Sequence, residues 1–525
     1  MCCDLEVDVN DEQTFLVDKK VLTSFSGRLS KLFGKLTGST RKLKVIFPDF
    51  PGGVEGFELI VRFCYNNGRI DMSPSNIFLL SCAANFMEMN KDSSNMPNLV
   101  GQIEKYLDGI NYWTWSDFLV GLKQCQNLLP FMSSSCILHD FLKLFVVKHD
   151  FHTVSSPSTS SSNISSPQIS FDVNADSIRN QCSRTTWWFE DLVFMNINLF
   201  EMVIKTMISH ELDHTMICSF LFYYQKSSSL GASPLQKCKI TETLINLLSM
   251  LDGSCISCRG LFHIFRVSSS MEKLSRCCKN KLENLIGSRL DQATLDDLLV
   301  PPPRHQSCMY DVNLILRFQK SFLLKSSNRF FLYRLKKVAA LMDLYMAEVA
   351  PDPGLRPSKF VALVTALPDF GRDFFDQIYQ ALDMYLEVHC SLCEEEKITL
   401  CSSLNYGKLS PETLKHLAQN SNFPESMVVT AIVSRKSKLE SLLQDTLHLK
   451  TLSDSLLHYN KKGNEVKNGD AEEILLYVNT LGLSTENEKQ IGAHIQGMQW
   501  GVMELKKVCR KMQPQMANTM QPTKM

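Results

Sequence analysis

The chain has 525 residues, of which 44% are hydrophobic and 21% are charged, and its 55 Lys and Arg residues balance 55 Asp and Glu residues. This length exceeds what a single hydrophobic core usually organises, so several domains are expected. The balanced charge argues against a nucleic-acid-binding protein, because such proteins normally carry a basic excess.

The chain lacks the sequence features of a secreted or membrane-spanning protein. No stretch approaches the roughly 18 uninterrupted apolar residues that span a bilayer. Its start, MCCDLEVDVNDEQ, has neither the basic nor the apolar region of a signal peptide. We therefore expect a cytoplasmic protein in which most of the 18 cysteines are reduced and buried as small hydrophobic side chains.

The first 90 residues combine strand and helix patterns. Apolar and polar side chains alternate in residues 5–9 and 43–47, as in half-buried strands. Apolar residues recur at helical spacing in residues 21–36, 54–65 and 74–89. The resulting order of strand, helix, strand, helix and helix predicts a small α+β domain.

We assign this α+β domain to residues 4–90, and the helical pattern that follows it to an extension over residues 91–151. Residues 152–185 are rich in Ser and Pro and contain few large apolar side chains. Such a segment cannot bury enough surface to offset its chain entropy. It is therefore predicted to be a flexible linker.

Long helical periodicities without convincing strand pairs predict an all-α domain over residues 186–440. The prolines of residues 301–303 are expected to stop the helix that contains LDDLLV, because proline lacks the amide donor and restricts the residue before it. The prolines within residues 351–357 mark the next junction between helices. A further helical extension is expected over residues 441–483.

Residues 484–513 show the pattern of a short coiled coil. Thr485 and Glu488 have the spacing of a helix capping box. A heptad seam follows, made of Ile491, Ile495, Met498, Val502, Leu505, Cys509 and Met512. Three glycines weaken this seam, so an amphipathic helix that packs on its own domain is an equal alternative. Residues 514–525 are predicted to be disordered.

The N-terminal segment DLEVDVNDEQTFLVDKKVLTSFSGRLSKLF resembles the start of a BTB/POZ fold. The segment FELIVRFCYNNGRIDMSPSNIFLLSCAANFMEM continues that resemblance into the later helices of the same fold. One departure is Asp18, at a position where BTB domains commonly have a histidine.

The later part of the chain contains the segments WWFEDLVFMNINLFEMVI, LDQATLDDLLVPPP, YDVNLILRF, LMDLYMAEVAPDPGLRPSKFVALVTALPD, YQALDMYLEVH and KLSPETLKHLAQNSNFP. In sequence and in order, these segments resemble those of the plant family named after non-phototropic hypocotyl three and root phototropism two, the NRL family. This resemblance marks residues 186–440 as the family-specific helical domain. Cys390 departs from the family pattern, in which the preceding His is usually followed by Pro.

The expected fold is therefore multidomain, with an N-terminal α+β BTB/POZ fold, a large all-α domain and a short C-terminal coiled-coil-like helix. The resemblance implies that the BTB/POZ domain forms a homodimer, or a heterodimer with a family member. It also implies that this domain docks a cullin-three-type scaffold, while the other domains recruit client signalling proteins for ubiquitination. An adaptor of this kind contributes proximity and performs no chemistry itself.

A second hypothesis is a signalling scaffold in phototropism or auxin transport that acts at the periphery of the plasma membrane without a ligase. The loop GKLTGSTRKLK lacks the hydrophobic-x-acidic triplet that many cullin-binding BTB domains present. In place of that triplet stand Lys35, Arg41, Lys42 and Lys44. A second basic cluster, within residues 506–511, would attract anionic lipid, although a solvated basic helix face is the commoner explanation of such a cluster.

The pentad His210, Glu211, Leu212, Asp213 and His214 satisfies the H-E-x-x-H pattern of zinc hydrolases. On a helix its two imidazoles would share a face and ligate zinc, with Glu211 activating the bound water. The following TMICSFLFYYQK provides no third ligand at the spacing that such peptidases use. Because the pentad lies between two apolar helical runs, a junction between helices is expected, and a zinc hydrolase is the remote alternative.

Two C-x-x-C pairs, Cys255 with Cys258 and Cys390 with Cys393, have the spacing of zinc ligands. Their flanks resemble apolar helix rather than tight turns, so buried structural cysteines are expected there and at residues 277–278. No nucleophile elbow, glycine-rich phosphate loop or kinase signature occurs in the sequence. We therefore predict no catalytic residue, no cofactor and no metal.

Tyr379 and Tyr385 lie in an acidic helical segment and are candidate phosphorylation sites, because phosphate would add charge at a packed surface. The alternative is that both rings belong to the hydrophobic core. The Ser-rich linker is a more accessible region for a kinase.

Overall fold

The computed structural model describes residues 4–33, 43–90, 98–132, 136–148, 187–271, 273–303, 308–324, 331–438, 440, 441 and 444. Its contacts divide the chain into two units, residues 1–285 and 286–525, and each unit is described separately. The predicted linker 152–185, coiled coil 484–513 and tail 514–525 lie outside the described residues, as do nearly all residues of the predicted extension 441–483.

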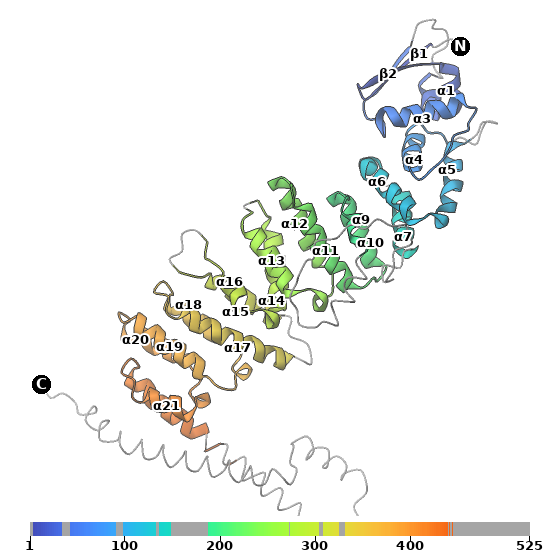
Figure 1. The fold of residues 1–525 in the computed structure, drawn as a ribbon. Coiled ribbons are helices and arrows are strands. Elements are labelled where there is room, and N and C mark those ends of the chain that lie inside the picture. The colour runs from blue at the N-terminus through green and yellow to red at the C-terminus, as the bar shows by residue number, and fades with distance from the viewer. Residues whose placement is uncertain are drawn as a thin grey trace, which may run out of the picture. The chain divides into compact units, whose positions relative to one another are not determined.

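The first unit begins with a three-stranded sheet of order β2-β1-β3 (Figure 1). Strand β1 (Leu5–Val9) pairs antiparallel with β2 (Gln13–Val17) and parallel with β3 (Leu43–Phe47). Every second side chain of β1 is fully buried, which confirms the strand that alternation predicts, and β3 is confirmed as well. Strand β2 was not predicted, because most of its side chains are exposed and its sequence shows no strong alternation.

The turn between β1 and β2 explains why the chain reverses so soon. Asn10 and Asp11 both have positive φ, 55° and 57°, and the Glu12 amide donates to the Val9 carbonyl over 3.0 Å. Two consecutive residues with positive φ form the turn that matches the twist of a hairpin, and Asn and Asp tolerate this conformation better than other side chains.

Four helices complete the small α+β region. They are α1 (Lys19–Phe25), α2 (Gly27–Phe33), α3 (Gly53–Tyr65) and α4 (Ile77–Phe86). The single helix predicted over residues 21–36 is thus wrong, because the chain breaks at Ser26 into two helices. The predicted helices 54–65 and 74–89 are observed as α3 and α4, the latter shorter than predicted.

The next helices pack directly against the α+β region. They are α5 (Leu99–Leu107), the 3-10 helix η1 (Asp108–Tyr112), α6 (Trp115–Met132) and α7 (Cys136–Lys148). Phe78 of α4 lies 4.7 Å from Phe141 of α7 and 6.3 Å from Trp113, measured between ring centroids. Gln124 of α6 accepts the Phe78 amide through Oε1 over 2.9 Å, so α6 also satisfies the start of α4.

The rest of the first unit is helical. Its elements are α9 (Phe189–Leu192), α10 (Ile197–Ser209), α11 (His214–Ser228), α12 (Pro234–Leu248), η2 (Gly253–Cys255), α13 (Cys258–Ser269) and α14 (Arg276–Ser288), whose last turn enters the second unit. Helix α12 begins with a capping box between Ser233 and Gln236 and with Pro234 in its first turn, a combination that favours a sharp helix start.

The second unit stacks helices in two layers. Its elements are η3 (Leu290–Gln292), α15 (Leu295–Leu298), α16 (Val312–Leu324), α17 (Phe331–Val349), α18 (Pro357–Thr365), η4 (Asp369–Gly371), α19 (Asp376–Val388), α20 (Glu394–Cys401), η5 (Tyr406–Lys408) and α21 (Pro411–Leu417). Helix α17 packs on α15 and α19, whereas α18 packs on α16 and α20. Residues 425–438 are helical too.

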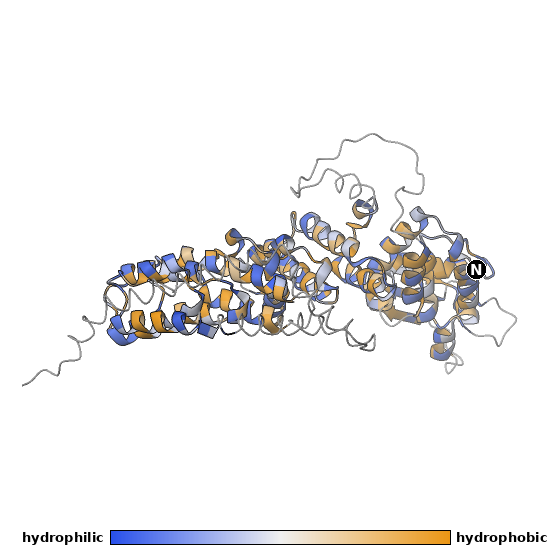
Figure 2. Cartoon of the chain, turned by 90° about the horizontal axis from the view of Figure 1, so that it is seen from below, coloured by the Kyte–Doolittle hydropathy of each residue, from blue (hydrophilic) through white to orange (hydrophobic). Residues whose placement is uncertain are grey.

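These helices bear out the all-α expectation for the described residues from 187 onward. The individual helices carry both hydrophobic and hydrophilic residues in Figure 2, as expected of helices that each bury one side. The prolines of residues 301–303 follow α15, and Pro357 starts α18, as predicted. No helix of the described residues is both long enough and apolar enough to cross a lipid bilayer.

Candidate interaction surfaces

The outer face of the N-terminal sheet exposes apolar side chains on both edge strands. Leu16 of β2 is 59% exposed and Ile46 of β3 is 56% exposed. Between these strands, Lys44 Nζ lies 3.1 Å from Glu6 and 3.8 Å from Asp8, and the hydrogen bond and charge of Glu6 raise the Lys44 pKa. An ion pair flanked by exposed apolar side chains is a surface suited to another protein.

Asp18, the departure from the BTB pattern, has a clear structural role. It is the N-cap of α1, and its Oδ1 accepts the Lys20 amide over 2.9 Å. Its own amide donates to the Tyr65 hydroxyl over 2.6 Å. The carboxylate therefore satisfies an amide at the start of α1, which a side chain without an acceptor could not do.

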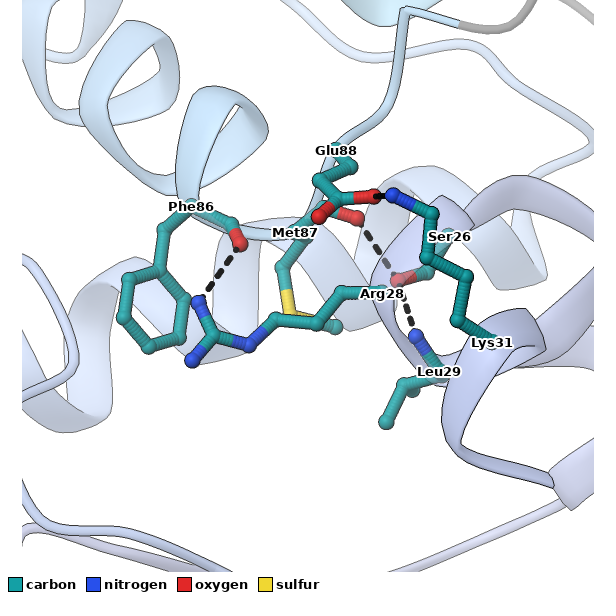
Figure 3. Close-up of polar contacts among 7 residues, drawn as sticks. All are labelled: Ser26, Arg28, Leu29, Lys31, Phe86, Met87 and Glu88. Atoms are coloured by element: carbon teal, nitrogen blue, oxygen red, sulfur yellow. Dashed lines mark hydrogen bonds and ion pairs between the residues drawn. The ribbon is translucent and has the colours of Figure 1, made fainter.

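The break between α1 and α2 is held by the end of α4 (Figure 3). The Ser26 hydroxyl donates to the Met87 carbonyl over 2.8 Å and accepts the Leu29 amide over 3.2 Å. The Gly27 amide donates to the Glu88 carbonyl over 3.1 Å, and a Cβ at residue 27 would lie only 2.8 Å from that oxygen. A buried serine and a side-chain-free residue are therefore both needed at this break.

Helix α2 is fixed on the same junction by two basic side chains (Figure 3). The Arg28 guanidinium lies over the Phe86 ring at 4.0 Å and donates to the Phe86 carbonyl over 3.2 Å. Lys31 Nζ lies 2.5 Å from Glu88 Oε2. Leu32 of the same helix stays 51% exposed, just before the predicted cullin-docking loop 34–44, of which only Leu43 and Lys44 are described.

A second exposed apolar surface lies in the second unit, on a loop between α18 and α19. We call residues 369–374 the aromatic loop. Its Phe370 is 57% exposed and its Phe374 is 66% exposed. On the adjacent α17, Tyr333 is exposed and lies three residues before Lys336, whose Nζ contacts Asp373 over 2.8 Å. Aromatic side chains held in solvent are typical of protein-binding sites.

The backbone of the aromatic loop is firmly held although its two phenyl rings face solvent. Lys408 Nζ donates to the Asp369 carbonyl over 2.5 Å and to the Arg372 carbonyl over 2.6 Å. Asn405 donates to the Asp369 carboxylate over 2.9 Å. Because the loop is ordered before binding, a partner would not bear the entropic cost of ordering it.

The anchor of the loop is an ion pair in the core. Arg372 Nε donates to Asp343 Oδ1 of α17 over 2.8 Å, and the two side chains are 1% and 9% exposed. Burial raises the pKa of the Asp343 carboxyl, and the Arg372 charge opposes that shift. Two buried charges that face each other fix the loop against α17.

Sequence reasoning missed the aromatic loop. Its signal is the segment DFGRDFF, in which large aromatic residues alternate with charged ones outside any helical period. The buried Phe375 cannot be told from the exposed Phe374 by pattern alone, since the two are adjacent and identical.

The two candidate phosphorylation sites lie in the core of the second unit. The Tyr379 hydroxyl is 2.6 Å from His416 Nδ1, and the Tyr385 hydroxyl donates to the Leu355 carbonyl over 2.7 Å. Burial raises the pKa of Tyr379 to about 12 and raises the pKa of Tyr385 as well. Phosphorylation stays a prediction, and it would require either ring to leave its pocket.

The H-E-x-x-H pentad forms the predicted junction between helices, and not one helix. Helix α10 ends at Ser209, Glu211 has a positive φ of 57°, and Asp213 caps α11 by accepting the Thr215 amide over 3.0 Å. His214 Nδ1 accepts the Asp252 amide over 3.0 Å. The zinc hypothesis requires both imidazoles on one face of one helix. The two imidazoles do not lie on one helix, so this arrangement is not present.

The cysteine pairs differ from expectation. Cys258 and Cys278 are buried as predicted, and Cys255 is half-buried. Cys277, Cys390 and Cys393 are exposed, so the prediction of buried cysteines is wrong for these three. Cys390 and Cys393 lie in the turn between α19 and α20, and Cys277 lies in the first turn of α14, so none of the three is inside an apolar helix. Among the described residues, no group of three or more His, Cys, Asp or Glu side chains is arranged to hold a metal ion.

Comparison with known proteins places these features in a family. Residues 186–413 match the model of the NPH3 family. The chain is 40% identical over 520 residues to BTB/POZ domain-containing protein At3g22104 of Arabidopsis thaliana, covering 98% of this chain and 95% of the relative. It is 33% identical over 471 residues to BTB/POZ domain-containing protein At1g50280 of the same plant, covering 84% and 89%. The chain therefore belongs to the NPH3 family of BTB/POZ domain-containing plant proteins, as its sequence motifs indicated.

Proposed function

We propose that the chain is a client-recognition adaptor of a cullin-three-type ubiquitin ligase. Residues 4–90 form a BTB/POZ domain that dimerises and docks the cullin, and the helical region recruits the client. The observation that carries this proposal is the presence of two exposed apolar surfaces on unlike folds of one chain: the outer face of the sheet and the aromatic loop. A chain that offers two separate protein-binding surfaces can bring two proteins together.

The mechanism of such an adaptor is proximity. Simultaneous binding of client and cullin holds a client lysine near the ubiquitin-loaded enzyme, so a rare encounter becomes effectively intramolecular. The adaptor's own side chains contribute shape and apolar contact. Leu32 and Ile46 flank segment 34–42 in sequence and are the described residues that we assign to the cullin side. Phe370 and Phe374 are assigned to the client side.

The test is co-purification of the full chain with cullin three, combined with the mass of each complex by light scattering. We expect a dimer that binds cullin, and Ile46→Glu should weaken dimerisation or cullin binding. Thr14→Glu is the matched control, because it adds the same charge to the exposed face of the edge strand β2 without removing an apolar side chain. The double variant Phe370→Ala/Phe374→Ala should retain both dimer and cullin.

One observation favours a second candidate, a signalling scaffold that dimerises and binds clients without a ligase. Lys44 occupies the end of the loop where many cullin-binding BTB domains present an acidic residue, and its charge is directed to Glu6 and Asp8 of the sheet. A dimer that binds no cullin would contradict the ligase proposal and support the scaffold. A monomer without cullin would contradict both candidates.

A further inference from the structure

The turn between α19 and α20 exposes two cysteines three residues apart. Cys390 lies in the turn directly after α19, and Cys393 is the N-cap of α20. Four of the described cysteines are exposed, namely Cys136, Cys277, Cys390 and Cys393. Only the last two form a C-x-x-C pair. The turn itself is closed by the Leu392 amide, which donates to the His389 carbonyl over 3.2 Å.

The Cys393 sulfur has a structural task in the reduced chain. The Glu396 carboxylate accepts the Cys393 amide over 3.2 Å, and the Cys393 sulfur occupies the N-cap position of a capping box opposite the Glu396 amide. Ser or Thr usually occupies this capping position, because sulfur is a weak acceptor. A hydroxyl would cap this helix better than the exposed Cys393 thiol does. Helix capping therefore does not by itself explain a cysteine at this position.

Neither core packing nor zinc accounts for the pair. Cysteines that serve packing in this chain are buried, as Cys401 of α20 shows, and burial raises the pKa of that thiol to about 12. A structural zinc site requires four ligands, and no suitable group of three occurs among the described residues. Two exposed thiols at C-x-x-C spacing remain available for exchange with a disulfide.

We propose that Cys390 and Cys393 are a redox-active dithiol that exchanges with glutathione disulfide. One cysteine thiolate attacks a sulfur of glutathione disulfide, forms a mixed disulfide and releases one glutathione thiolate. The second cysteine thiolate then attacks the bonded cysteine sulfur and releases the second glutathione. The protein loses two protons and two electrons, which leave with two molecules of reduced glutathione.

Oxidation of this dithiol changes the start of α20. A disulfide redirects the Cys393 sulfur toward residue 390 and so removes it from its capping-box position opposite the Glu396 amide. Helix α20 packs on α18 and α19 through buried residues such as Leu400, so loss of its cap loosens this part of the second unit. The redox state would in this way set the stability of one helix in the stack.

The test is mass spectrometry of the full chain equilibrated with mixtures of reduced and oxidised glutathione. After alkylation of free thiols, trypsin releases residues 373–397, a peptide that contains both cysteines and no other. We expect this peptide to lose two hydrogens as the mixture becomes more oxidising. Cys390→Ser and Cys393→Ser should each accumulate glutathione on the remaining cysteine, as is also expected of the exposed Cys277 in the native chain.

Two results would overturn the proposal. One is a native peptide 373–397 that carries glutathione as stably as Cys277, which would mean that the second thiol cannot resolve the mixed disulfide. The other is a peptide that stays reduced while Cys277 reacts. Amide hydrogen exchange over residues 394–401 reports the structural effect separately, and faster exchange is expected only in the oxidised chain with both cysteines present.

Discussion

Arg372 and Asp343 form an ion pair across 2.8 Å, with side chains only 1% and 9% exposed. The pair joins the aromatic loop to α17, so the exposed Phe370 and Phe374 depend on a contact that is buried beneath them. The loop therefore has two separate parts. The buried Arg372 fixes its conformation, and the exposed rings of Phe370 and Phe374 offer contact area to a partner.

Breaking this ion pair should destabilise the second unit strongly. Arg372→Met leaves the Asp343 carboxylate buried without its partner, and we expect a loss of about 3–5 kcal/mol in the free energy of unfolding. The double variant Arg372→Met/Asp343→Leu should recover most of that loss, because apolar side chains can replace a buried ion pair. The unfolding free energies of the single and the double variant can be measured by chemical unfolding, with hydrogen exchange in the second unit as the signal. A single variant as stable as the native chain would contradict the assigned role.

Removing the Ser26 hydroxyl from the break between α1 and α2 should lower the stability of the first unit. Ser26→Ala removes a hydroxyl that bonds both Met87 and Leu29, and leaves a buried carbonyl and amide without that partner. We expect a loss of about 1–3 kcal/mol. Ser24→Ala is the control, because Ser24 is exposed and bonds only within its own helix, so its cost should stay below about 0.5 kcal/mol. Equal costs for the two serines would argue against the junction.

The sequence predicts those helices and strands in which buried side chains recur at the regular spacing of a helix or a strand. Alternation identifies β1 because Leu5, Val7 and Val9 are all fully buried on one face. The same reasoning misses β2, an edge strand that exposes most of its side chains. It also joins α1 and α2 into one helix, because Leu22 and Leu29 keep a helical period across the break. The break itself depends on the Met87 carbonyl, 61 residues away from Ser26, which no local pattern contains.

The candidate surfaces are predictable to a lesser extent. The family motifs indicate the domain types, but exposure of Phe374 beside the buried Phe375 depends on how the loop meets α17 and Lys408. The exposure of Cys390 and Cys393 likewise depends on where α19 ends. Exposed loop residues do not repeat with the period of a helix or a strand. Their role can therefore be recognised only once the structure shows which residues surround them.

Substitutions at two residues of the H-E-x-x-H junction, Glu211 and Asp213, should have opposite effects on stability. Glu211 adopts a left-handed conformation that costs most side chains about 1–2 kcal/mol, so Glu211→Gly should keep or raise stability. Asp213 caps α11, and Asp213→Ala should lower stability by about 1 kcal/mol. Thermal unfolding of the two variants tests this. A loss with Glu211→Gly as large as that with Asp213→Ala would show a role for the Glu211 carboxylate that the junction does not explain.

Tyr379 should contribute a pH-dependent stability in the alkaline range. Burial raises its pKa from 10.0 to about 12 in the folded chain, so the unfolded chain releases the proton first as the pH rises. The stabilisation is fully present below pH 10, where both states are protonated, and is lost as the pH rises toward 12. The difference in unfolding free energy between the native chain and Tyr379→Phe should therefore shrink between pH 10 and 12. A difference that stays constant over this range would contradict a buried, protonated hydroxyl.

Phe374 and Phe375 provide the sharpest test of the aromatic loop, because two identical neighbours face opposite environments. Phe374 is 66% exposed and Phe375 is 1% exposed. Phe375→Ala should lower the free energy of unfolding by about 3–5 kcal/mol through the cavity that it leaves. Phe374→Ala should change stability by less than about 0.5 kcal/mol, yet it should weaken binding of a client by about 2 kcal/mol if the ring is an anchor. Unfolding and client affinity of each variant separate the two roles, since loss of affinity without loss of stability can arise only from a contact made in the complex. A client that binds the Phe374→Ala chain as tightly as the native chain would remove the aromatic loop from the client side and move the search to other faces of the helical region.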